Sequence, residues 1–156
     1  MTDYTMMCRQ MEALGEGCSK PLPVLANAAA LLWASLPDIN WAGFYLRRND
    51  MLILGPFQGK PACTEIRIGK GVCGTAAQRE ETVVVDNVHL FPGHIACDAA
   101  SNSEIVVPFF RATGEPAGVL DIDSTSFSRF SGEDREGLEL FTAGLREWID
   151  WEDGLI

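Results

Sequence analysis

Apolar residues recur at helical spacing near both ends of the chain. Residues 21–37 begin and end with proline, and the first proline suits a helix start. Within this segment one helical face carries apolar side chains at Leu25, Ala28, Ala29, Leu32 and Leu36. Residues 129–153 show a second amphipathic pattern, with Ser131 as the expected N-cap. Asp134 stands three residues later, where a capping box prefers Glu or Gln.

Between these helices, apolar and polar residues alternate over short runs, which is typical of strands. The expected strands are 39–48, 51–59, 63–68, 82–88, 104–112 and 116–124. Turn residues at Asn49-Asp50 and at 113–116 join two pairs of them as hairpins. Turn glycines followed by helix formers predict a short helix within 69–80. We therefore predict an α+β fold with a mostly antiparallel central sheet, terminal helices packed on one face and active-site loops on the other.

Length and charge narrow the class of protein. The 156 residues fit one domain over 1–156, in which residues 1–20 are poorly patterned. A net charge of -10 and no cluster of basic residues argue against binding to nucleic acid or to a membrane surface. No apolar run reaches the roughly 18 residues of a membrane span. The first ten residues do not resemble a secretory signal, so we expect a cytoplasmic protein.

The five cysteines are an odd number without a CxxC pair, which disfavours a secreted disulfide framework and a structural zinc site. Cys97 lies in a loop of small and polar residues between His94 and Glu104. Cys63 has similar surroundings, whereas Cys73 matches the packed first turn of a helix. A free cysteine is often only a small hydrophobe, an interpretation that we favour for Cys73 alone. His94 either lowers the pKa of Cys97 or, as we favour, shapes a turn.

Three carboxylates are expected to gather near the loop that carries Cys97. Asp121 and Asp123 are two positions apart on one expected strand and share a face. Glu104 opens the strand that pairs with it. Like charges held together resist joint ionisation, so one carboxyl would keep its proton at neutral pH and donate it to a substrate oxygen. The alternative is a solvated strand end.

Five motifs, taken in order, resemble those of one enzyme family. They are INWAGFYL, LILGPFQGK, GVCGTA, GHIACDAASNSEIV and GVLDIDS. Together they are similar to the free methionine-(R)-sulfoxide reductases, which are single GAF-domain enzymes, from about Pro21 to Phe141. The resemblance implies a GAF fold and the thiol-dependent reduction of free L-methionine-(R)-sulfoxide to methionine.

The resemblance also implies roles for the cysteines. Cys97 would be the nucleophile and would pass through a sulfenic acid. Cys63 would be the resolving thiol, which forms an intramolecular disulfide with it. Cys73 would be an auxiliary catalytic cysteine. Cys8 and Cys18 exceed the three cysteines of the family pattern, so we treat them as bystanders.

The same resemblance places an acid cluster and one aromatic side chain in the pocket. Glu104 and Asp123 would be catalytic and, together with Asp121, would bind the substrate. Trp41, whose alternative is plain core packing, would pack against the substrate methyl group. Thioredoxin is the implied reductant, no metal or organic cofactor is needed, and pairing into a homodimer is left open.

Two other functions compete with this interpretation. GAF domains also bind small ligands and signal without catalysis, so a non-catalytic sensor module is the main alternative. A thiol peroxidase would use Cys97 on a peroxide, but it would need neither the acid cluster nor Trp41.

Overall fold

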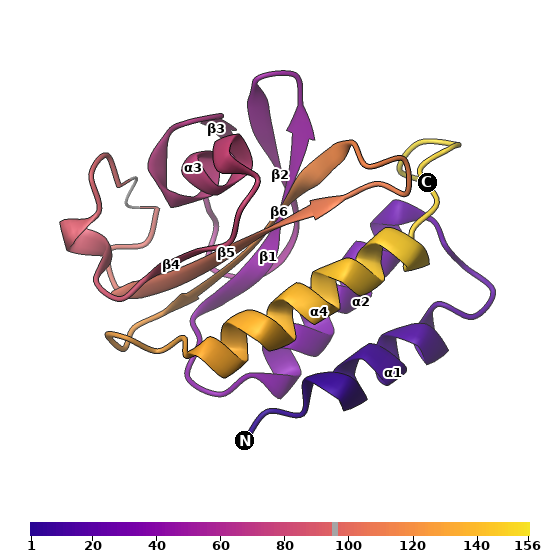
Figure 1. The fold of residues 1–156 in the computed structure, drawn as a ribbon, viewed down its shortest axis with the longest axis horizontal. Coiled ribbons are helices and arrows are strands. Elements are labelled where there is room, and N and C mark those ends of the chain that lie inside the picture. The colour runs from indigo at the N-terminus through magenta and orange to yellow at the C-terminus, as the bar shows by residue number, and fades with distance from the viewer. Residues whose placement is uncertain (95–96) are drawn as a thin grey trace.

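A six-stranded antiparallel sheet forms the centre of the protein (Figure 1). The computed structural model describes residues 1–94 and 97–156. The helices in these residues are α1 (Tyr4–Leu14), α2 (Pro21–Ser35), α3 (Gly71–Arg79), the short 3-10 helix η1 (Val88–Leu90) and α4 (Gly132–Trp148). The strands are β1 (Trp41–Arg48), β2 (Met51–Gly59), β3 (Glu65–Arg67), β4 (Val83–Val85), β5 (Ser103–Phe110) and β6 (Pro116–Ser124). Their order is β3-β2-β1-β6-β5-β4, with each neighbouring pair antiparallel, as predicted.

The helices divide between the two faces of the sheet (Figure 1). Helices α1, α2 and α4 lie together on one face, where α2 packs on β1 and β2 and α4 packs on β5. The short helix α3 lies on the opposite face against β5 and β6, next to the long loops. The predicted arrangement of terminal helices and loops is thus confirmed, and α3 joins the loop face.

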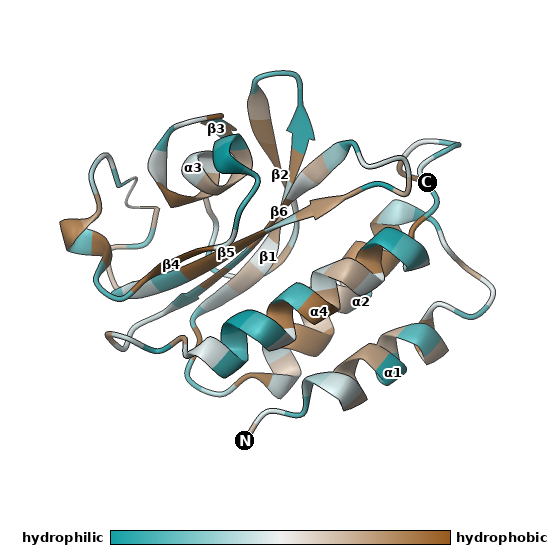
Figure 2. Ribbon diagram, viewed as in Figure 1, coloured by the Kyte–Doolittle hydropathy of each residue, from teal (hydrophilic) through white to brown (hydrophobic). Residues whose placement is uncertain are grey.

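Alternation along the central strands builds a hydrophobic core on each face. In β6, Leu120 and Ile122 lie in the core beneath the terminal helices, whereas Val119 lies in the core beneath α3. Asp121 and Asp123 share the side of Val119, because successive side chains point to opposite faces. Hydropathy along the ribbon shows brown central strands and an α4 with both brown and teal turns (Figure 2). The α3 face therefore receives the polar residues of strands that are otherwise apolar.

Helix α4 begins as predicted, directly after its N-cap Ser131. The Ser131 hydroxyl accepts a hydrogen bond from the Asp134 N–H at 3.2 Å, and the Asp134 carboxylate accepts one from the Ser131 N–H at 2.9 Å. Asp134 therefore closes the capping box at the position where Glu or Gln is more usual. The same carboxylate pairs with Arg129 at 3.0 Å and accepts a hydrogen bond from the Tyr4 hydroxyl at 2.7 Å, which ties α1 to α4.

The poorly patterned residues 1–20 contain helix α1. Asp3 caps it by accepting a hydrogen bond from the Met6 N–H at 2.9 Å. Met7 and Met11, one turn apart, are buried in the core beneath the terminal helices. In the described parts of the chain, no helix has both the length and the apolar character needed to cross a bilayer.

Candidate active site

The strand register brings the sequence-predicted acids together on the α3 face. Trp41 of β1 pairs with Asp123 of β6, which pairs in turn with Glu104 of β5. Asp121 lies one row further along the same face, opposite Gly43. Glu104 and Asp121 are buried, with 7% and 6% of their surface exposed. The predicted three carboxylates therefore lie together; Glu104 and Asp121 are buried rather than at a solvated strand end, and Asp123 is half-buried.

Burial and mutual repulsion keep protons on this cluster. The pKa values of Glu104 and Asp123 are raised well above their ordinary range, first by burial and then by the neighbouring Asp121 charge. Burial also raises the pKa of Asp121, but hydrogen bonds from Glu104 and Cys73 oppose this rise. All three pKa values are therefore raised, and hydrogen bonds favour the charged forms of Asp121 and Asp123 but not that of Glu104.

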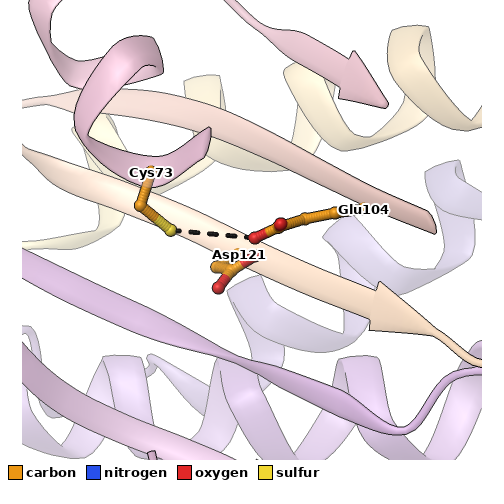
Figure 3. Close-up of side chains that lie close together, drawn as sticks. All are labelled: Cys73, Glu104 and Asp121. Atoms are coloured by element: carbon orange, nitrogen blue, oxygen red, sulfur yellow. Dashed lines mark hydrogen bonds between the residues drawn. The ribbon is translucent and has the colours of Figure 1, made fainter. Parts of the chain in front are cut away.

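Cys73 completes the cluster from helix α3, and its sulfur points at the two carboxyl groups (Figure 3). Its thiol donates a hydrogen bond to the Glu104 carboxyl over 3.9 Å. Burial, followed by the charges of Asp121 and Glu104, raises its pKa well above the ordinary value. Cys73 is both packed in a core, as favoured from the sequence, and part of the site. It remains a thiol that donates a hydrogen bond.

One ligand atom from each of Cys73, Glu104 and Asp121 lies within 4.8 Å of the others. A soft thiolate with two carboxylates is a donor set that a divalent cation could use. Burial raises the pKa values of two of these groups, Cys73 and Glu104, well above the ordinary range and so favours retention of their protons. Metal binding would require their loss, so the arrangement is better suited to hydrogen-bonding a substrate oxygen.

Cys63 and Cys97, from two separate loops, are joined by a disulfide with a Cα–Cα distance of 5.9 Å. This pair matches the nucleophile and resolving thiol that the family resemblance implies. Cys8 and Cys18 are free, and Cys8 packs against the core on the other side of the sheet. Within the predicted GHIACDAASNSEIV motif, residues 95–96 lie outside the described residues.

Hydrogen bonds fix both cysteine loops to strand β1 and to the residue before it. The Tyr45 hydroxyl donates to the Cys63 carbonyl at 2.8 Å, and the Trp41 indole N–H donates to the Lys60 carbonyl at 3.1 Å. On the other loop, the Asn40 amide donates to Asp98 at 3.2 Å and to Ser101 at 3.0 Å. These contacts hold the disulfide over the acid cluster.

A pocket of about 570 Å³ between atoms, its open mouth included, joins these parts. The sequence-predicted residues that line it are Trp41, Cys73, His94, Cys97, Glu104, Asp121 and Asp123. Sequence reasoning missed the ten other residues that line it, namely Tyr45, Lys60, Pro61, Ala62, Ile66, Lys70, Gly71, Val72, Asp98 and Ser101. Tyr45 shares a strand face with Trp41, and this period-two spacing was a signal that could have identified it.

The structure bears on the two alternatives that the sequence left open for Trp41 and for His94. Trp41 is 4% exposed and stacks on Tyr45 and Phe57 at centroid distances of 5.9 and 5.2 Å. It is therefore a core residue whose remaining surface lines the pocket. The His94 N–H donates to the Phe91 carbonyl at 3.2 Å, as in a turn, and burial lowers its imidazole pKa. A neutral imidazole has no positive charge with which to stabilise the Cys97 thiolate. This agrees with the interpretation that His94 shapes a turn.

Comparison with known proteins places the chain in a family. A family model described as a GAF domain matches residues 25–150. The chain is 54% identical over 150 residues to the free methionine-R-sulfoxide reductase of Escherichia coli (strain K12), covering 96% of this chain and 90% of that protein.

Solved structures agree with this placement. The reduced form of fRMsr of Staphylococcus aureus superposes with a TM-score of 0.91 at 49% identity, covering 96% of this chain and 97% of that one. The same protein in complex with substrate gives a TM-score of 0.90 at 48% identity, covering 96% and 97%. The chain therefore belongs to the GAF-domain family and, within it, to the free methionine-R-sulfoxide reductases.

Proposed function

We propose that this protein reduces free L-methionine-(R)-sulfoxide to methionine with Cys97 as nucleophile. The observation that carries the proposal is one pocket lined both by Cys97, which a disulfide joins to Cys63, and by buried carboxyl groups whose pKa values are raised. The relative from Escherichia coli bears the name of this activity, and the similar Staphylococcus aureus structure is described as a substrate complex.

The first step needs a proton on the sulfoxide oxygen, because an unprotonated sulfoxide sulfur is a poor electrophile. Glu104 and Asp123 hold protons at neutral pH and line the pocket. One of them protonates the oxygen while the Cys97 thiolate attacks sulfur. A second proton, from the other acid, lets the oxygen leave as water. A water molecule then attacks the Cys97 sulfur of the resulting sulfonium, which releases methionine and returns one proton to the acids. Substrate sulfur gains two electrons, and Cys97 becomes a sulfenic acid.

The second step uses the neighbouring thiol. The Cys63 sulfur attacks the Cys97 sulfenic acid, a disulfide forms and water leaves. The 5.9 Å between their Cα atoms is within the usual disulfide range. Cys97 is on an exposed residue position, so a dithiol protein can approach it and restore both thiols by exchange. We propose thioredoxin for this task, in the reducing cytoplasm expected from the sequence.

The aromatic wall fixes which epimer reacts. Trp41 is held by its stacking on Tyr45 and Phe57 and by its hydrogen bond to the Lys60 carbonyl. With the acids on the floor and a fixed indole at the side, one sulfoxide epimer can place its methyl group on the indole and its oxygen on the acids. The family membership makes that epimer R.

The test measures methionine formation from racemic methionine sulfoxide with dithiothreitol as reductant. The unreacted substrate is then analysed by chiral chromatography. We expect half of the racemate to be consumed and the S epimer to be left. Binding without methionine formation would favour the sensor module, and consumption of peroxide alone would favour a thiol peroxidase. Equal loss of both epimers would contradict the fixed pocket. Cys97→Ser is the inactive variant, and Cys8→Ser, on the opposite face, is its matched control.

A further inference from the structure

Asn40 connects the strands of the acid cluster to the loop that carries Cys97. It directly precedes Trp41, the first residue of β1, and its backbone N–H donates to the Asp123 carbonyl at 2.9 Å. Its half-buried side chain is not one of the described residues that line the pocket. Any effect of Asn40 on the reaction must therefore pass through the residues that it holds.

The Asn40 amide holds the Cys97 loop at two points. Its nitrogen donates to the carboxylate of Asp98, the residue directly after Cys97, at 3.2 Å and to the hydroxyl of the buried Ser101 at 3.0 Å. The other carboxylate oxygen of Asp98 accepts from the Ala100 N–H at 2.9 Å, and the Asp98 carbonyl accepts from the Ser101 N–H at 3.2 Å. Residues 98–101 thus form one turn that a single side chain attaches to the sheet.

This attachment has a cost in stability. The Asn40 Oδ1 atom is buried without a hydrogen-bond partner among the described residues. A buried carbonyl oxygen without a partner destabilises the native state, and an apolar side chain of similar size would avoid this cost. An exception of this kind calls for an explanation, and the two N–H groups of the same amide provide one.

A different side chain anchors the far end of the loop. The Asn102 amide donates to the Thr125 carbonyl at 2.6 Å, and its backbone N–H donates to the Ser124 carbonyl at 2.8 Å. The near end is held in the oxidised protein by the disulfide from Cys97 to Cys63 as well as by Asn40. Reduction removes this disulfide. Among the described residues, Asn40 is then the side chain that attaches Asp98 to the sheet.

We propose that Asn40 is a positioning residue that aims the reduced Cys97 at the substrate sulfur. The thiolate must approach the sulfur from the side opposite the leaving oxygen, and a misplacement of about 1 Å can cost on the order of 100-fold in rate. Asn40 bonds both to Asp98, next to the nucleophile, and to Asp123, one of the proposed proton donors. This inference rests on the proposed reductase function and adds a residue that acts on it through the loop.

The test reverses the direction of the hydrogen bond between positions 40 and 98. Asn40→Asp removes both N–H donors and sets a second carboxylate against that of Asp98. In the double variant Asn40→Asp with Asp98→Asn, the new amide donates to the new carboxylate, and the Ser101 hydroxyl can donate to it as well. The matched control is Asn27→Asp, the same exchange at an exposed position of α2 on the opposite face of the sheet.

The readout is methionine release in one turnover of the reduced enzyme without added reductant, over a range of substrate concentrations. We expect Asn40→Asp to lower the maximal rate by about 10- to 100-fold and to keep the half-saturating concentration within about threefold of the wild type. The double variant should regain most of this loss, and Asn27→Asp should match the wild type. A wild-type rate in Asn40→Asp, or a double variant as slow as Asn40→Asp, would overturn the proposal.

Hydrogen exchange of the loop distinguishes a misplaced loop from a damaged fold. In reduced Asn40→Ala, amides of residues 98–101 should exchange at least about tenfold faster than in the reduced wild type, because nothing else described holds Asp98 to the sheet. In the oxidised variant the disulfide still holds Cys97, so the acceleration should be less than about threefold. Unchanged exchange in the reduced variant, or equal acceleration in both redox states, would also overturn the proposal. A wild type that forms no methionine would instead refute the reductase function.

Discussion

Replacing Glu104 with Gln should slow methionine release strongly and at the same time stabilise the protein at alkaline pH. Glu104 is buried opposite Asp123, and burial together with the Asp121 charge raises its pKa well above the ordinary value. Gln keeps the shape and the hydrogen-bonding capacity of the side chain but has no proton to transfer. General acid catalysis is worth about 10²–10⁴-fold, or about 2.7–5.4 kcal/mol of activation free energy.

The stability change follows from the same raised pKa. The native state holds the Glu104 proton to a higher pH than the unfolded state does. Its contribution to stability is therefore fully present below the ordinary pKa of 4.5 and is lost as pH rises through the raised native value. Above both values, each unit of difference costs about 1.4 kcal/mol. Because Gln removes this cost, Glu104→Gln should melt above the wild type at pH 8 and close to it at pH 4.

The assay is rapid-quench measurement of methionine with reduced enzyme in excess over substrate, repeated from pH 5 to pH 10. The wild-type rate should fall on the alkaline side as the donor proton is lost, and the variant should be slow throughout. Glu136→Gln, at an exposed position of α4, is the matched control and should change neither rate nor melting. If Glu104→Gln releases methionine as fast as the wild type, and its pH–rate profile falls at the same alkaline pH, Glu104 is not the proton donor.

Three further predictions test the cysteine pair and Asp121. Cys97→Ser should form no methionine. With thioredoxin as reductant, Cys63→Ser should release about one methionine per enzyme and then stall, as measured by chromatography. Steady turnover in Cys63→Ser would mean that another thiol resolves the sulfenic acid. Asp121→Asn should raise KM more than it lowers kcat in steady-state assays, and the reverse pattern would make it a catalytic group. The Cys63–Cys97 disulfide spans a sequence separation of 34, so loop-closure entropy gives it about 4 kcal/mol. Calorimetry with and without dithiothreitol should then show a Tm roughly 8–16 °C lower after reduction, and equal values would mean that the link restricts the unfolded chain very little.

The strands and their faces were predictable because alternation and turns are local signals. The 113–116 turn fixes the register of β5 against β6, and this register alone sets Glu104 opposite Asp123. Helix α1 was missed because its buried residues, Met7 and Met11, form a single i,i+4 pair too short to produce a pattern. Its attachment depends on contacts from Tyr4 to Asp134, which are 130 positions apart in the chain.

The remainder of the site could not be read from periodicity. The proximity of Cys63 and Cys97 depends on the paths of two loops, and it was available only from the family resemblance. The pocket lysines carry no local signature, since Lys60 follows a strand and Lys70 precedes a short helix. They become neighbours of the acids because Trp41 and α3 hold those segments over β6. The positions of these loop residues therefore depend on the tertiary structure and could not be predicted from local sequence patterns.

Burial explains how one pocket can hold two groups with opposite protonation requirements. The proposed reaction needs a thiolate on one cysteine and a proton on a nearby carboxyl. Cys73 is buried beside the carboxylates, which raise its pKa further, so it stays neutral and does not compete as nucleophile. Cys97, the proposed nucleophile, lies at an exposed position in its loop, where water can solvate its thiolate. On the proposed mechanism the proton donor therefore lies on the buried floor of the pocket and the proposed nucleophile at an exposed position, so we expect the rate to fall at both ends of the pH range.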